Sequence, residues 1–303
     1  APPFEKTDPK EVMELRTESS KVMDNGDGTY SMEMFQEPVF RKNSGKWKEI
    51  QPKLKKQKAV NSFASESVDE LATENTLIDI RFSPKMNKNK YAVLAYKGHT
   101  LSYTFREASG EKGVQKVKNT AASYEENKIF YEDVIPGLTL RNIVFDESVK
   151  EDIILSHYSG TSNYHFFMET DLTAQMEENG SITLRDQQNE IIYTLPKPFM
   201  TDSNINPESA EPQRSEDVHF ELSKEKKGYA FTVVADPNWL KDPTRVYPVY
   251  IDPTTKVQAN HDASVSSAYP NANYGSDWDA GLGAYILKAG NYSSETGENF
   301  AYI

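Results

Sequence analysis

The stretch Leu101-Ser102-Tyr103-Thr104-Phe105-Arg106 alternates apolar and polar side chains at every step. A period of two residues puts the apolar side chains on one face of a β-strand and the polar side chains on the other. Strands of antiparallel sheets commonly bury one face and expose the other in this way. The same alternation recurs in Tyr30-Ser31-Met32-Glu33-Met34 and in Val218-His219-Phe220-Glu221-Leu222. These segments predict a mostly β fold.

Other runs are apolar on both faces, namely Tyr91 to Tyr96, Ile191 to Leu195 and Tyr229 to Val234. Such runs are typical of central strands or inner layers that are covered on both sides. Turn residues separate the strand-like segments, as in Lys97-Gly98-His99 and Asn179-Gly180, and each of these predicts a hairpin. Layers covered on both sides indicate stacked sheets and not one exposed sheet.

Helix signals are few. Pro9 to Arg16 and Ser65 to Glu74 are the better candidates, and we expect neither to organise the fold. The compositions of Gly110 to Ser123 and Thr201 to Asp217 predict long loops. The fold class that follows is a set of antiparallel β-sandwich-like domains with few short helices.

The length of 303 residues corresponds to about two domains. Composition changes at Ile251-Asp252-Pro253-Thr254-Thr255, which we take as a domain boundary. We predict an N-terminal extension over residues 1–18, a β-rich domain over 19–135 and a second β-rich domain over 136–255 that can be continuous with the first. Residues 256–303 are fewer than the roughly 100 of a β-sandwich, so we expect an incomplete, jelly-roll-like β module there.

The charge balance limits the class of partner. With 46 acidic and 34 basic side chains, the net charge is −12. Binding to nucleic acid or to an anionic membrane surface requires clustered basic residues, so neither is an expected partner, although Lys53 to Lys58 could make a local contact. No apolar run is long enough to span a bilayer. The absence of cysteine excludes disulfides, thiolate metal sites and cysteine nucleophiles.

Known catalytic and metal motifs are missing from the sequence. Asp24-Asn25-Gly26-Asp27-Gly28 resembles a calcium loop but has glycine where an oxygen ligand belongs, so it predicts a hairpin turn. The five histidines never show the spacing that places two metal ligands on one helix face. Neither a Gly-x-Ser-x-Gly elbow nor a phosphate-binding glycine loop occurs. We therefore expect no catalytic residue, no metal and no cofactor.

Paired carboxylates leave one enzymatic alternative open. Glu132-Asp133, Glu151-Asp152 and Glu177-Glu178 are adjacent acids. Glycoside hydrolysis needs two carboxyl groups that face each other across a cleft. Neighbours on a strand point to opposite faces, so adjacency in sequence does not supply that geometry. A glycan-active enzyme that uses an Asp/Glu pair remains the alternative to a non-catalytic chain.

Aromatic residues near the C-terminus suggest a different activity. Tyr269, Tyr274 and Trp278 lie among Asn, Ser and Gly, with Tyr285 nearby. Aromatic rings stack on sugar rings while polar neighbours bind the hydroxyl groups. We predict Tyr269, Tyr274 and Trp278 as carbohydrate-binding residues, the alternative being that they pack inside the C-terminal module.

From about Val12 to Ile303 the chain resembles the N-terminal region of the wall-associated protein A family of Bacillus and its relatives. The strings that carry this resemblance are Arg16-Thr17-Glu18, Gly26-Asp27-Gly28-Thr29-Tyr30, Val149-Lys150-Glu151-Asp152, Lys197-Pro198-Phe199-Met200-Thr201-Asp202-Ser203, Asn238-Trp239-Leu240-Lys241-Asp242-Pro243, Arg245-Val246-Tyr247-Pro248-Val249 and Ile251-Asp252-Pro253. After them, Ser267 to Tyr274, Trp278 to Ala280 and Ala284 to Lys288 look like the opening strands of a carbohydrate-binding or cell-wall-binding β-sandwich module.

The resemblance implies a secreted, cell-wall-associated YD-repeat protein that acts as a polymorphic toxin in contact-dependent growth inhibition. In that family a separate C-terminal toxin, often a nuclease, performs the catalysis. The chain would then be a non-catalytic scaffold and wall-association region. Its implied partners are cell-wall polysaccharide or peptidoglycan and the YD-repeat remainder of its own polypeptide. A purely protective segment that contacts the YD-repeat part is a further alternative.

Overall fold

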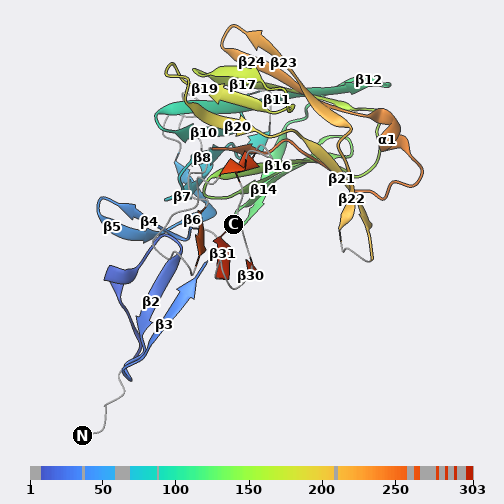
Figure 1. The fold of residues 1–303 in the computed structure, drawn as a ribbon. Helices are drawn as coiled ribbons and strands as arrows, with labels where there is room; N and C mark the ends of the chain where they lie inside the picture. The colour runs from blue at the N-terminus through green and yellow to red at the C-terminus, as the bar shows by residue number, and fades with distance from the viewer. Residues whose placement is uncertain are drawn as a thin grey trace, which may run out of the picture. The chain divides into compact units, whose positions relative to one another are not determined.

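The computed structural model describes residues 8–35, 38–58, 69–86, 89–207 and 211–257, together with the backbone of five short strands between 263 and 302. The chain divides into two compact units, residues 51–258 and residues 1–50 with 259–303. The mostly β fold predicted from the alternating segments is confirmed (Figure 1). Among the described helices, none has the length and apolar character needed to cross a membrane.

Two large antiparallel sheets make up the unit of residues 51–258. Over the described residues, the first has nine strands in the order β23-β24-β17-β11-β10-β8-β7-β6, with β12 added to β11. Their bounds are β6 Gln51–Lys58, β7 Asp69–Glu74, β8 Asp79–Phe82, β10 Ala92–Tyr96, β11 His99–Gly110, β12 Gly113–Lys116, β17 Asn163–Thr170, β23 Val218–Glu225 and β24 Gly228–Ala235.

The second sheet has twelve described strands, with the main order β18-β19-β20-β26-β16-β15-β14-β13-β9, while β25 joins β16 to the β21–β22 hairpin. Their bounds are β9 Lys85–Met86, β13 Thr120–Glu125, β14 Lys128–Ile135, β15 Leu138–Val144, β16 Ser148–Leu155, β18 Thr173–Met176, β19 Ile182–Arg185, β20 Ile191–Leu195, β21 Phe199–Ile205, β22 Pro212–Ser215, β25 Val249–Asp252 and β26 Thr255–Lys256.

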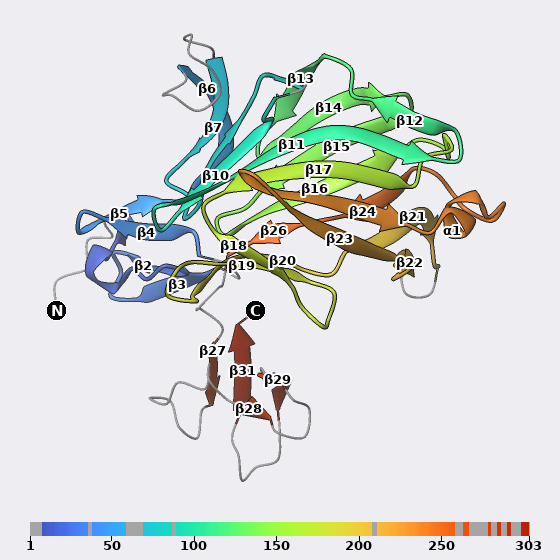
Figure 2. The same ribbon diagram turned by 90° about the horizontal axis from the view of Figure 1, so that it is seen from above.

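The two sheets pack face to face around one apolar core. Figure 2 shows β10, β11 and β17 in one layer and β14, β15 and β16 in the other. Phe105 pairs in register with Phe166, and Phe166 pairs with Phe231, on three neighbouring strands. These rings lie 4.7 Å and 5.1 Å apart between centroids and are buried. The alternation that begins at Leu101 therefore fills the space between the sheets.

The smaller unit contains short strands. Its N-terminal part has a three-stranded sheet and a hairpin, with bounds β1 Lys10–Glu11, β2 Ser20–Asp24, β3 Tyr30–Met34, β4 Phe40–Asn43 and β5 Lys46–Glu49. A 3₁₀ turn, Met13–Leu15, lies between β1 and β2. The C-terminal strands are β27 Ala263–Ser266, β28 Trp278–Asp279, β29 Ala284–Tyr285, β30 Gly290–Asn291 and β31 Glu298–Tyr302.

The hairpin expected at Asp24 to Gly28 forms between β2 and β3. Gly26 and Gly28 have φ values of 72° and 84°, a left-handed conformation that glycine adopts without steric cost. The expectation that Tyr30 to Met34 buries one face is wrong, because Tyr30 and Met32 are 65% and 61% exposed. Strand β3 lies at the edge of a small sheet, where there is little apolar surface to pack against.

Four local predictions are also wrong. The helix candidate Ser65 to Glu74 contains β7, and Pro9 to Arg16 contains only β1 and the 3₁₀ turn. The segments expected as loops, Gly110 to Ser123 and Thr201 to Asp217, carry β12, β13, β21 and β22 in part. Pairing with long neighbouring strands outweighs their weak local propensity. The one α-helix in the described residues, α1 (Pro237–Lys241), begins after Asp236, whose side chain accepts from the Asn238 amide.

Candidate functional site

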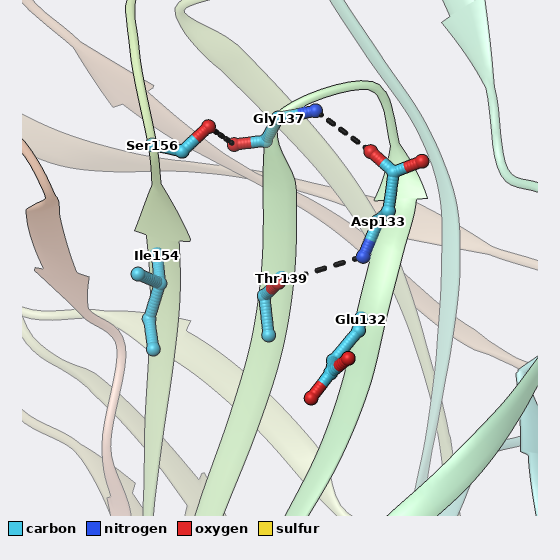
Figure 3. Close-up of a pocket in the computed structure, with 6 residues that line it drawn as sticks. All are labelled: Glu132, Asp133, Gly137, Thr139, Ile154 and Ser156. Atoms are coloured by element: carbon cyan, nitrogen blue, oxygen red, sulfur yellow. Dashed lines mark hydrogen bonds between the residues drawn. The ribbon is translucent and has the colours of Figure 1, made fainter.

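An open hollow of about 390 Å³ lies at one end of strands β14, β15 and β16 in the twelve-stranded sheet. Six residues line it, and Figure 3 shows all of them: Glu132, Asp133, Gly137, Thr139, Ile154 and Ser156. Four of the six residues have polar side chains, and Ile154 contributes an aliphatic one. The hollow contains one of the acidic pairs that the sequence singled out.

A β-bulge shapes the rim of this hollow. The pairing of β14 with β15 shifts between Tyr131 and Ile135, and Asp133 there has a left-handed φ of 49°. The Asp133 carboxylate accepts from the Gly137 amide at 2.9 Å and from Lys118 Nζ at 3.0 Å. The hydrogen bond from Lys118 is the main cause that lowers the pKa of Asp133. Asp133 therefore stays ionised and fixes the turn.

The neighbouring Glu132 has a different environment. Its side chain is exposed and extends towards the hollow, away from the Asp133 carboxylate (Figure 3). Thr139 Oγ1 lies 3.4 Å from the Asp133 amide, and Ser156 Oγ donates to the Gly137 carbonyl at 3.3 Å. The hollow thus presents one carboxylate and two hydroxyl groups beside an aliphatic side chain. Such a set of groups suits hydrogen bonding to a polar ligand.

The pair Glu151-Asp152 is divided between the two faces of its sheet. Glu151 lies between the sheets and is 8% exposed, and the Tyr91 hydroxyl donates to its carboxyl group. Burial raises the pKa of Glu151 to about 8. A cavity of only about 10 Å³ adjoins it, enough for one water molecule and too small for a substrate.

Asp152 is held by cations instead. Arg141 donates to its Oδ2 through Nη2 at 2.7 Å, and Lys150 donates to its Oδ1 at 2.9 Å. Lys150 also lies 3.4 Å from Asp252, so four charged groups form a chain across β15, β16 and β25. The cluster links three strands. Because its charges compensate one another, it offers no free carboxylate to a substrate.

In the third pair, Glu177-Glu178, the first carboxylate also makes local hydrogen bonds. Glu177 accepts from Thr183 Oγ1 and from Arg185 Nη2, and the hydrogen bond from Thr183 is the main cause that lowers its pKa. In each of the three pairs at least one carboxylate is therefore held within the protein. The opposed free carboxyl groups of glycoside hydrolysis do not occur at these three positions.

Sequence reasoning missed a row of hydroxyl and imidazole groups across β11, β17 and β24. His165 Nε2 lies 2.7 Å from Ser109 Oγ, and its Nδ1 lies 3.0 Å from Thr232 Oγ1. A serine–histidine–aspartate triad orients the ring with a carboxylate, whereas here a threonine hydroxyl takes that position. Strand register alone brings these three residues together, so no local motif could have indicated them.

The predicted carbohydrate-binding aromatics lie in the C-terminal module. Trp278 pairs in backbone register with Tyr285 on the hairpin of β28 and β29. Tyr269 and Tyr274 lie outside the described residues. The prediction that Tyr269, Tyr274 and Trp278 bind carbohydrate therefore remains a prediction.

Three of the strings that carry the family resemblance meet in the structure. Arg245, which is 4% exposed at its side chain, pairs with the fully buried Asp202 at 2.9 Å. Its guanidinium also lies 4.1 Å from the centre of the Trp239 ring at α1. The ion pair anchors the segment after α1 to β21, which gives a structural reason for these otherwise irregular strings.

Comparison with known proteins gives long matches. The chain is 39% identical over 301 residues to the tRNA nuclease WapA of Bacillus subtilis strain 168, covering 97% of this chain and 12% of that protein. It is 38% identical, with the same coverage, to the tRNA(Glu)-specific nuclease WapA of Bacillus subtilis subsp. natto. The chain thus spans about an eighth of the length of these relatives.

A shorter relative is matched over most of its own length. The wall-associated protein of Geobacillus stearothermophilus is 39% identical over 212 residues, which are 68% of this chain and 80% of that protein. No family model matches the sequence, and no solved structure matches the fold. The long alignments at this identity show that the chain belongs to the family of wall-associated proteins that includes WapA.

Proposed function

We propose that this chain is a non-catalytic scaffold and cell-wall-association region of a secreted, contact-dependent toxin carrier. The observation that carries the proposal is the match to a wall-associated protein over 80% of that protein's length. The relatives that are named as nucleases are much longer proteins, and the chain aligns with only 12% of their length. The activity of those proteins therefore gives no reason to assign catalysis to this region.

The described sandwich supports a scaffold role. Its two sheets share one continuous core that extends from Leu54 to Val257. Closely packed interiors of this kind have low compressibility and hold the outer surface in a fixed shape. A rigid sandwich can thus hold a binding surface in a fixed position and shape.

The charge of the chain bears on how it would bind walls. At a net charge of −12, attraction to the phosphates of anionic wall polymers is unfavourable. Binding through hydrogen bonds and apolar contacts is weakened little by salt, because screening acts on separated exposed charges. We therefore propose wall binding that does not depend on net electrostatic attraction.

The test is sedimentation of the full chain with purified Gram-positive cell walls. The expected result is that the chain pellets with the walls and stays bound at about 0.15 M salt, where exposed charges are screened beyond about 8 Å. Failure to pellet would overturn wall association, and complete elution at that salt concentration would overturn the binding mode.

Non-catalysis needs a separate test. We expect the purified chain to leave total tRNA and wall glycan intact over long incubations, with no new RNA ends and no released reducing sugar. The appearance of either product, abolished by an acidic-residue substitution, would identify this region as an enzyme.

A further inference from the structure

We propose that the hollow bounded by Glu132, Thr139, Ile154 and Ser156 is a binding site for an uncharged saccharide, held through its hydroxyl groups. The inference rests on the proposed function, since wall glycan would be the saccharide within reach. It adds a location, a ligand chemistry and a set of contact residues within the sandwich itself.

The dimensions and lining of the hollow suit such a ligand. Its volume of about 390 Å³ falls within the range of small-molecule sites, roughly 300 to 1,000 Å³. Sugar hydroxyls both donate and accept hydrogen bonds. Glu132 offers only acceptors. The Thr139 hydroxyl accepts from the Asp133 amide and can still donate, and the Ser156 hydroxyl donates to the Gly137 carbonyl and can still accept. The half-buried Ile154 provides an aliphatic surface for the C–H face of a sugar ring.

Glu132 has the strongest capacity to bind a ligand. Among the described residues, none forms an ion pair or hydrogen bond with its carboxylate, whereas the adjacent Asp133 is bound to Lys118 and Gly137. Hydrogen bonds to an ionised acceptor are roughly twice as strong as neutral ones. Two neighbouring sugar hydroxyls could donate to the two oxygens of Glu132 together.

The same charges select against anionic ligands. A phosphate in the hollow would meet the carboxylate of Glu132, which pairs with no cation among the described residues, and like charges at short range disfavour binding. The ligand chemistry is therefore that of a neutral glycan and not that of a phosphate-rich polymer.

The rim is also fixed before a ligand arrives. The Asp133 carboxylate accepts a hydrogen bond from the Gly137 amide and so fixes the turn. His157 packs so closely against Gly137 that a Cβ at position 137 would lie 2.5 Å from the imidazole ring. A rim that is already ordered loses little conformational entropy on binding. β-Bulges of this kind are frequent next to functional sites.

The experiment compares three forms of the full chain. The double variant Glu132→Ala/Thr139→Val removes the free carboxylate and one hydroxyl. Glu178→Ala removes the same charge at an exposed position in the β18–β19 turn and serves as the matched control. Both are surface changes, and equal thermal melting curves would show that the fold is retained. Binding is measured by wall sedimentation and by NMR titration of backbone amides with N-acetylchitotetraose.

We expect the wild type and Glu178→Ala to bind walls equally and the double variant to bind at least fivefold more weakly. The tetrasaccharide should shift the amides of Glu132, Thr139 and Ser156 in the wild type. Equal wall binding by all three forms would overturn the site and leave wall association standing. Failure of the wild type to bind walls, with the amide shifts present, would overturn the proposed function and leave the site standing. Absence of shifts up to about 10 mM tetrasaccharide, where a millimolar site is mostly filled, would overturn the site in every case.

Discussion

Replacement of Glu151 by glutamine should remove a pH-dependent loss of stability from the sandwich. Glu151 lies on β16 between the sheets, where Tyr91 donates to it and Tyr103, Asn142 and Thr255 line the adjoining cavity. Glutamine has nearly the same shape and can still accept from the Tyr91 hydroxyl. The substitution therefore removes the ionisable group with little change in packing.

The magnitude follows from the pKa of this carboxyl group. Burial raises the pKa of Glu151 from 4.5 to about 8, against the effect of the Tyr91 hydrogen bond and with a contribution from Asp152 and Asp252. Since the folded pKa is raised, the stabilisation is fully present below pH 4.5 and is lost as pH rises to about 8. A tenfold change in proton affinity is worth about 1.4 kcal/mol, so the loss is on the order of 5 kcal/mol at most.

The assay is urea unfolding of the full chain at pH 5, 6, 7 and 8, followed by far-UV circular dichroism. The free energy of unfolding of Glu151→Gln minus that of the wild type should increase steadily from pH 5 to pH 8. Taking this difference cancels the contributions of the other titrating groups, which both proteins share. Glu178→Gln makes the same chemical change at an exposed turn position and is measured alongside as the control substitution.

A constant difference between Glu151→Gln and the wild type over this range would refute the reasoning. It would mean that Glu151 has the same proton affinity in the folded and unfolded chains. The carboxyl group would then have to reach solvent or a compensating cation in the folded protein.

Three further substitutions test the packing. Arg245→Met leaves the fully buried carboxylate of Asp202 without its cation, so the free energy of unfolding should fall by about 3–5 kcal/mol in urea titrations. A loss below about 1 kcal/mol would contradict burial of the pair. Phe231→Ala removes a ring that is 2% exposed and should cost about 3–5 kcal/mol, and an unchanged midpoint would show that the sheets do not meet there. Gly228→Ala would place a Cβ 2.0 Å from the Met168 carbonyl oxygen on the neighbouring strand. The melting temperature should therefore fall by several degrees, and an unaltered melting temperature would disprove this close approach.

Local sequence patterns predicted much of the fold. The alternation from Leu101 to Arg106 correctly placed Leu101, Tyr103 and Phe105 inside the sandwich. The turn signals at Asp24 to Gly28 and at Lys97-Gly98 correctly placed two hairpins. These predictions succeed because strand period and turn conformation depend on a few consecutive residues.

Predictions that depended on weak local propensity failed. The interleaved acids of Ser65 to Glu74 indicated a helix, but residues 69–74 pair with β6 and β8. The half-buried face expected for Tyr30 to Met34 is exposed. In both cases the outcome depends on the strands and the apolar surface alongside the segment, and the propensity of the segment itself does not contain that information.

The sequence by itself determined the class of fold, the hairpins, the alternating core residues and the family to which the chain belongs. Only the tertiary structure decided the candidate site: it turned Glu151 and Asp152 to opposite sides of a sheet, and it joined Ser109, His165 and Thr232 in one row. It also shaped the bulge at Asp133 and brought Glu132 into the lining of the hollow together with Thr139 and Ser156. The physical reason is that register between strands sets these distances, and register is fixed by packing over the whole sandwich and not by neighbours along the chain.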